Sequence, residues 1–210
     1  MKTKQRILQS SLELFNARGE PKVTTIDIAS EMSISPGNLY YHYRNKGEIV
    51  ESLFGDFESQ LLEVLEAPVI EEFEWIDVWV FVSIVFDRLW EYRFIFLDTH
   101  SLLRRYDALA NRFRRLQSKS QEEFYNLIQA YMREGQLVLS AEAQQTLVVQ
   151  LSLSVQHWFA HYWQYVDQDP TGRDIKNHGV FQVLMLLAMH MSADQQQELL
   201  RLAHSEGVDT

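Results

Sequence analysis

The sequence contains no cysteine and few residues that favour turns, with 8 glycines and 4 prolines among 210 residues. Without cysteine there is no disulfide framework, no thiol catalysis and no zinc site with cysteine ligands. Glycine and proline together are about half as frequent as in an average protein. Because sandwiches and barrels need many turns, this scarcity argues against an all-β fold.

Long hydrophobic runs are also missing. The longest charge-free apolar stretch runs from Val78 to Phe86, which is far shorter than the ~20 residues of a membrane-spanning helix. The opening residues, MKTKQR, do not resemble a signal peptide. Apolar residues make up 46% of the chain and charged residues 23%, which is typical of a folded globular protein. We therefore expect a cytoplasmic protein with no membrane partner.

Positive charge is scarce overall but concentrated near the start of the chain. The formal net charge is −10, yet residues 1–47 carry seven Lys or Arg against four Asp or Glu, a balance of +3. The remaining residues therefore sum to −13. A basic segment on an acidic body indicates that only the N-terminal part meets a polyanion, although chance could produce the same distribution.

The spacing of apolar residues predicts an all-α fold, because helical periodicity recurs along the chain and no segment alternates at period two. Nine or ten helices are expected. Their predicted ranges are 3–18, 24–32, 36–42, 45–67, 75–98 with an interruption near Arg93, 100–116, 120–134, 140–166, 174–191 and 192–207.

Three short helices followed by a longer fourth within 60 residues have the layout of a helix-turn-helix DNA-binding head. Thr24 with Asp27 predicts a capping box at the second helix, and Ser35 followed by Pro36 predicts the start of the third. The head therefore divides off near residue 50, giving a DNA-binding domain over 1–50 and a body over 51–210. The small core of the head is predicted to contain Ile26, Ala29, Ile34, Leu39 and Tyr43.

The rest of the third helix is predicted to face double-stranded DNA. Two adjacent tyrosines and a histidine are poor solvent groups, but their rings and polar atoms suit sugars, phosphates and base edges. One of the tyrosines alone could be a core residue, but adjacent helical residues cannot both point inward. Asn38 is the candidate for reading a base edge, and Lys46 for holding a phosphate at the start of the fourth helix. The predicted DNA-binding residues are Thr24, Thr25, Ser35, Pro36, Gly37, Asn38, Tyr40, Tyr41, His42 and Lys46.

Residues 24–50, TTIDIASEMSISPGNLYYHYRNKGEIV, resemble the signature of TetR-family transcriptional regulators. The resemblance implies an all-helical body that binds a ligand and dimerises, and it places residues 35–38, 40–42 and Lys46 at DNA-contacting positions. Two departures are visible, since Ser33 stands where glycine is usual and Tyr43 where phenylalanine is commoner. Either Ser33 adopts a left-handed conformation, or the turn differs slightly.

A looser resemblance reaches TetR-type regulators of polyhydroxyalkanoate synthesis genes. It is carried by the stretches LFNARGEP, SPGNLYYHYRNKGEIV and EYRFIFLD. The resemblance implies that the effector is an acyl molecule, either a fatty acid or an acyl thioester.

Residues 75–96 hold 8 of the 26 aromatic residues and are apolar on nearly every face, so this helix is expected to be buried all round. It either forms simple core or lines an apolar ligand cavity. Arg93 could bind a carboxylate or phosphate, or form a surface ion pair. The spacing of His157 and His161 suits a metal, but no third ligand lies nearby in the sequence, so no metal and no cofactor are expected. The candidate ligand-binding residues are Trp79, Phe86, Trp90, Arg93, His157 and His161.

Two late helices, over 140–166 and 174–191, are expected to be buried on two sides. The first carries an apolar stripe of Leu147, Leu151, Val155, Trp158 and Tyr162, and the second is apolar on most faces from Val180 to Met191. In the resembling family, two late helices pack against their symmetry mates, which implies a homodimer and a near-palindromic operator. The predicted interface residues are Leu151, Val155, Trp158, Tyr162, Val183 and Leu187.

These observations predict a ligand-responsive DNA-binding repressor that acts as a homodimer with an unidentified small apolar or acyl effector. Two alternatives remain, namely an activator of the same architecture and a protein-interaction adaptor with a non-functional helix-turn-helix. An enzyme is not expected, because the sequence has no glycine-rich phosphate loop, no G-x-S-x-G and no H-E-x-x-H.

Overall fold

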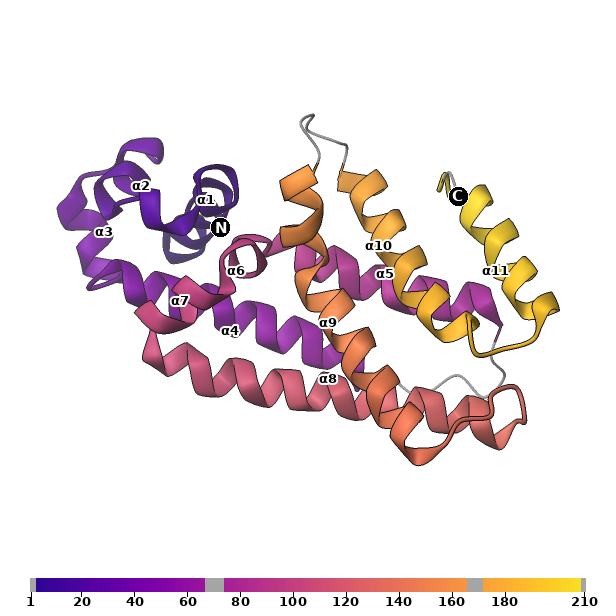
Figure 1. Ribbon diagram of the computed structural model, residues 1–210. Helices are drawn as coiled ribbons and strands as arrows, with labels where there is room; N and C mark the ends of the chain where they lie inside the picture. Colours follow the sequence, from indigo (N-terminus) through magenta and orange to yellow (C-terminus); the bar gives the residue numbers. More distant parts are fainter. Residues whose placement is uncertain (1–2, 67–73, 166–171, 209–210) are drawn as a thin grey trace. The chain divides into compact units, whose positions relative to one another are not determined.

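The computed structural model describes residues 3–66, 74–165 and 172–208. These residues form helices and no strands, as predicted (Figure 1). The elements are α1 (Thr3–Arg18), the 3-10 helix η1 (Glu20–Lys22), α2 (Thr25–Glu31), α3 (Pro36–His42), α4 (Lys46–Leu65), α5 (Trp75–Glu91), α6 (Phe94–Leu97), α7 (Thr99–Arg105), α8 (Asp107–Arg133), α9 (Ala141–Tyr165), α10 (Gly172–Ala188) and α11 (Ala193–Ser205).

The chain folds into two compact units. Unit 1 comprises Met1–Gln60 and Tyr92–Phe113, and unit 2 comprises Leu61–Glu91 and Arg114–Thr210. The α4 and α8 helices therefore each contribute residues to both units. The functional division at residue 50 remains a prediction, since the unit that holds α2 and α3 also includes α6, α7 and the start of α8.

The largest departure from the predicted helices lies between residues 99 and 133. We predicted two helices over 100–116 and 120–134, but α8 is continuous from Asp107 to Arg133. The intervening residues include no glycine or proline, and the hydroxyls of Ser118 and Ser120 donate to carbonyls one turn earlier instead of ending the helix. The chain breaks instead at Tyr106, between α7 and α8.

The interruption predicted near Arg93 is confirmed, because α5 ends at Glu91 and the four-residue α6 begins at Phe94. The prediction that this helix is buried all round was wrong. One face of α5 is buried, whereas Ile76, Val80 and Ile84 are 39–49% exposed at four-residue intervals. The α5 helix therefore buries one face and exposes the other, although both faces carry apolar side chains.

In unit 2, α10 packs against α5, α9 and α11 (Figure 1). Gly179 on α10 allows the closest approach, because a Cβ atom there would lie 2.2 Å from Cε1 of Phe86 and 2.6 Å from Cδ1 of Trp158. Neither ring is free to move. Phe86 is fully buried, and Nε1 of Trp158 donates to the carbonyl of Ile175 at 2.8 Å.

Gly179→Ala is expected to destabilise the protein, because the added methyl group meets two fixed aromatic rings. Overpacking of this kind costs about 3 kcal/mol, which corresponds to a melting temperature lower by about 6–12 °C. Differential scanning calorimetry measures the shift. The control is Gly37→Ala, where the nearest atom would be 3.9 Å away and the substitution is expected to be neutral or slightly stabilising. Equal melting temperatures for the two variants would contradict this packing.

Candidate DNA-binding site

The α2–turn–α3 motif begins with the predicted capping box. The backbone N–H of Asp27 donates to Oγ1 of Thr24 at 3.1 Å, and the backbone N–H of Thr24 donates to the Asp27 carboxylate at 2.7 Å. Oγ1 of Thr24 also donates to the Asp27 carboxylate at 2.6 Å, and the two bonds that this carboxylate accepts, from the side chain and the backbone of Thr24, lower the pKa of Asp27. The contribution of this cap is therefore present at neutral pH and is lost as the pH falls through the lowered pKa.

The turn between α2 and α3 takes the first of the two predicted forms, in which Ser33 is left-handed. Ser33 adopts a left-handed conformation with φ of 55°, and the N–H of Ile34 donates to the carbonyl of Ala29 at 2.9 Å. Ser35 then caps α3 by accepting the N–H of Asn38 at 3.2 Å, with Pro36 at the first position of the helix. The conformation of Ser33 thus closes the turn tightly enough for α3 to begin three residues later.

The inner side of the motif contains Ala29, Leu39 and Tyr43, which are at most 2% exposed. Ile34 is partly exposed at the edge of this core. The prediction for Ile26 was wrong, because its side chain is 63% exposed on α2. Residue 28, two positions later and fully buried, takes the inward position instead.

The outer side of α3 is the exposed surface that the sequence predicted. Tyr41 is 85% exposed and Tyr40 is 47% exposed, while His42 is half-buried with its ring against that of Tyr41. The Tyr40 hydroxyl lies 2.9 Å from Oγ1 of Thr25 and so links α3 to the start of α2. The remaining predicted contact residues on this side are also exposed, namely Ser35, Pro36, Gly37 and Asn38. The structure therefore gathers one polar and aromatic surface on α3 and the start of α2.

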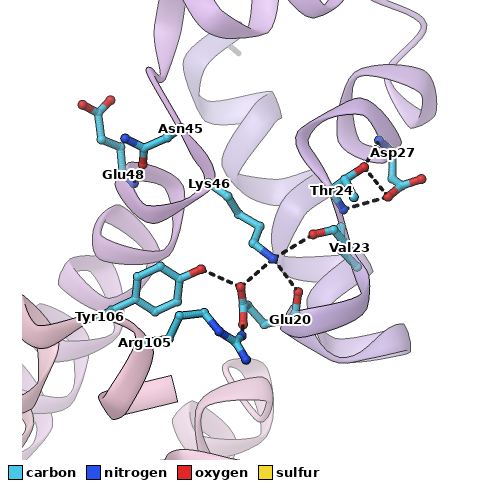
Figure 2. Close-up of polar contacts among 9 residues, drawn as sticks. All are labelled: Glu20, Val23, Thr24, Asp27, Asn45, Lys46, Glu48, Arg105 and Tyr106. Carbon is cyan, nitrogen blue, oxygen red and sulfur yellow. Dashed lines mark hydrogen bonds and ion pairs between the residues drawn. The ribbon is translucent and has the colours of Figure 1, made fainter. Parts of the chain in front are cut away.

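Lys46 differs from its predicted role, because its ammonium group points toward Glu20 and Val23 (Figure 2). It lies 2.7 Å from the carboxylate of Glu20 and donates to the carbonyls of Glu20 and Val23 at 3.0 and 2.9 Å. The ammonium group that we expected to bind a phosphate is therefore already engaged by three acceptor groups within the protein. At the start of α4, Oδ1 of Asn45 accepts the N–H of Glu48 at 3.0 Å and so caps the helix.

Sequence reasoning missed the buried carboxylate of Glu20. Its Glu-Pro-Lys context reads as a solvated loop, but the side chain is only 2% exposed. Arg105 and Tyr106, which also contact it, lie 85 and 86 residues later, and no local pattern could have indicated their proximity.

The predicted interface residues on α9 and α10 mostly lie inside one chain. Leu151, Val155, Val183 and Leu187 are at most 8% exposed, and Trp158 is held by its bond to Ile175. Tyr162 is half-buried, with its ring against that of Trp158. Leu151, Val155, Val183 and Leu187 fill the interior of unit 2, so their assignment to a subunit interface is corrected, whereas the assignment of Trp158 and Tyr162 stays a prediction.

The candidate ligand-binding residues are not gathered into one site. Trp79 and Phe86 are buried in unit 2, and the rings of Phe86 and Trp90 both lie within 6 Å of Phe159. Arg93 belongs to unit 1. His157 and His161 are exposed on α9, so their predicted pocket role is not supported. Within the described ranges, no group of three or more His, Cys, Asp or Glu side chains could hold a metal ion.

Comparison with known families identifies proteins that share this helix-turn-helix. A family model described as "Bacterial regulatory proteins, tetR family" matches residues 7–53, which include α2, the turn and α3. A second model, TetR, described as "Bacterial transcriptional repressor", matches residues 56–199, more than half of the chain. The chain belongs to the TetR family. TetR-family proteins are DNA-binding transcriptional regulators and not enzymes, which agrees with the exposed surface of α3.

Individual relatives agree with this TetR assignment. A TetR-family transcriptional regulator from Marinobacter aquaeolei VT8 is 29% identical, with a TM-score of 0.87 over 98% of this chain and 99% of that chain. The HTH-type regulator TtgW of Pseudomonas putida, described as uncharacterized, is 32% identical over 59 residues, which cover 28% of this chain and 44% of TtgW. IcaR of Staphylococcus epidermidis, a negative transcriptional regulator of the biofilm operon icaADBC, is 38% identical over 63 residues, which cover 28% of this chain and 34% of IcaR. The chain therefore spans less than half the length of these two curated relatives. No helix in its described part is long and apolar enough to cross a membrane.

Proposed function

We propose that this TetR-family protein is a ligand-responsive repressor in the cytoplasm that binds an inverted-repeat operator as a homodimer. The observation that carries the proposal is the outer side of α3, where two tyrosines and Asn38 are exposed while Leu39 between them is fully buried. A helix anchored from within and displaying polar and aromatic groups outward suits the major groove. The matching TetR model, described as a transcriptional repressor, favours repression over activation.

A seam of uncovered residues on α9 supports the homodimer. Val149, Leu153 and Trp163 are 45–48% exposed, and Gln156 and Ala160 between them are partly exposed. The intervals of four, three, four and three residues match the spacing with which helices pack side by side. Directly after α10, Met189 is 65% exposed, whereas Ala188, the last residue of the helix, is fully buried. These uncovered residues replace the buried set as the proposed interface.

The aromatic interior of unit 2 supports an apolar effector. The ring of Trp75 on α5 lies 6.3 Å from that of Tyr131 on α8, and the rings of Phe86 and Trp90 on α5 pack on Phe159 of α9, so aromatic side chains line the contacts of α5 with both helices. A small apolar or acyl molecule that enters this interior would shift α4, which contributes residues to both units. The effector can change DNA affinity only through its different affinity for the two conformations.

Selection of genomic fragments on the purified protein, followed by sequencing, tests the proposal. Enrichment of one inverted repeat, lost with Tyr41→Ala, is expected. Expression of the adjacent genes is then compared with and without the regulator gene, and increased expression in its absence distinguishes a repressor from an activator. A folded protein that enriches no fragment under any salt condition would contradict DNA binding and favour an interaction adaptor.

A further inference from the structure

Glu20 lies at the centre of a charged cluster within unit 1 (Figure 2). Its carboxylate accepts a hydrogen bond from the Tyr106 hydroxyl at 2.6 Å, pairs with Lys46 at 2.7 Å and is hydrogen-bonded by Nη1 of Arg105. Among the described residues it is the only charged side chain that is buried. One carboxylate thus joins two cations and a hydroxyl from separate parts of the chain.

The partners of Glu20 come from two parts of the chain, one next to the helix-turn-helix and one far from it in sequence. Glu20 itself is in η1, directly before α2, and Lys46 begins α4, four residues after the end of α3. Arg105 and Tyr106 lie at the break between α7 and α8, far from the motif in sequence. The Tyr106 ring also approaches the start of α4, since a Cβ at Gly47 would lie 3.4 Å from Cε1 of Tyr106. The cluster therefore fixes both ends of the α2–α3 motif to the α7–α8 junction.

The chemistry of the cluster makes this connection specific. Burial, together with the hydrogen bond to Glu20, raises the pKa of Tyr106, so the hydroxyl keeps the proton that it donates. Lys46 also donates to the carbonyls of Glu20 and Val23, which holds the loop before α2 in one conformation. A buried carboxylate that loses a cationic partner is left uncompensated, so the cluster favours one arrangement of its members strongly.

We propose that Glu20 is a positioning residue for DNA binding, through which the α7–α8 junction sets the affinity of the helix-turn-helix for its operator. This inference depends on the proposed function, because it concerns binding to that operator. Glu20 acts without touching DNA. Its negative charge would be repelled by phosphates, and its side chain is only 2% exposed. A movement of Arg105 and Tyr106 changes the support of η1 and α4, and the orientation of α3 changes with it.

Glu20→Gln tests the proposal, because glutamine keeps the size of the side chain and removes its charge. Operator affinity is expected to fall about tenfold, within the range of typical coupling between sites. The slope of log affinity against log salt is expected to stay unchanged, because no phosphate contact is lost. The matched control is Glu13→Gln, which makes the same change of charge at an exposed site on α1 and is expected to bind as the wild type does. Fluorescence anisotropy with the operator duplex measures both quantities, and thermal unfolding shows that each variant is folded.

Variants of the junction test whether the effect passes through the carboxylate. Tyr106→Phe removes one hydroxyl and is expected to weaken operator binding about threefold at an unchanged salt slope. Arg105→Gln is expected to weaken operator binding further, whereas Arg105→Lys is expected to retain most of the affinity. In the Glu20→Gln background, neither Tyr106→Phe nor Arg105→Gln is expected to cause any additional loss. If Glu20→Gln does not fold, Tyr106→Phe and Arg105→Gln test the proposal in its place. Wild-type operator affinity in both of these variants would overturn it.

Two further results would overturn the proposal while leaving the proposed function intact. One is a folded Glu20→Gln variant with wild-type operator affinity. The other is a loss with Arg105→Gln that persists in the Glu20→Gln background and lowers the salt slope by about one, which would mean that Arg105 contacts a phosphate directly. Failure of the wild-type protein to bind any operator would instead contradict the proposed function, so the two failures are distinguishable.

Discussion

Tyr41→Ala is expected to weaken operator binding by about 100-fold and to leave the free energy of unfolding unchanged. The side chain is 85% exposed, so its removal takes almost nothing from the core. Lost contacts to base edges or sugars cost about 1–3 kcal/mol in each half-site, and a symmetric dimer loses them twice. Fluorescence anisotropy measures the operator affinity, and chemical denaturation measures the free energy of unfolding.

The matched control for Tyr41→Ala is Tyr125→Ala, which removes a 47% exposed tyrosine from α8. This variant is expected to bind the operator as the wild type does. Tyr41→Phe separates the contribution of the ring from that of the hydroxyl. Because tyrosine is uncharged, the salt slope of Tyr41→Ala should equal that of the wild type. Wild-type affinity in both Tyr41→Ala and Asn38→Ala would show that α3 does not present these residues to DNA.

The helix-turn-helix could be predicted closely because its signals are local. Thr24 with Asp27 and Ser35 before Pro36 mark helix starts, because Thr24 and Ser35 each accept an N–H from the residue three positions later, and both caps form as predicted. The absence of a break in α8 was harder to predict, because a serine in mid-helix either caps a new helix or bonds back to the preceding turn. Only the packed structure decides between these two, and there Ser118 and Ser120 bond back.

The parts of the site that depend on tertiary contacts could not be predicted. Glu20 in its loop and Lys46 at a helix start each suggested a solvated side chain, and their pairing follows from packing between segments 26 residues apart in the chain. For α9 the sequence predicted a helix buried on two sides, but the sequence pattern does not distinguish the side covered by α10 from the side left open. Leu151 and Leu153 illustrate this, because both are leucines of one helix and only the first is buried.

Leu153→Arg is expected to convert the proposed homodimer to a monomer. Leu153 lies in the middle of the uncovered α9 seam, where two-fold symmetry would place two arginines in one desolvated interface. Burying unpaired charge is costly enough to raise the dimer dissociation constant by at least about 100-fold. Operator affinity should fall by a similar factor, because the two recognition helices no longer bind as a linked pair. Sedimentation velocity measures the oligomeric state across a dilution series.

Two matched substitutions separate loss of the interface from loss of folding. Val138→Arg places the same charge at a site that is 86% exposed outside the helices, and this variant should remain a dimer. Leu151→Arg, two residues from Leu153 on the same helix, buries the charge inside one chain and should therefore lower the melting temperature sharply. Leu153→Arg should keep the helical content of the wild type while it loses the partner subunit. If Leu153→Arg stays dimeric at low concentration, the subunits meet on another surface, and the exposed stripe of Ile76, Val80 and Ile84 on α5 becomes the next surface to test.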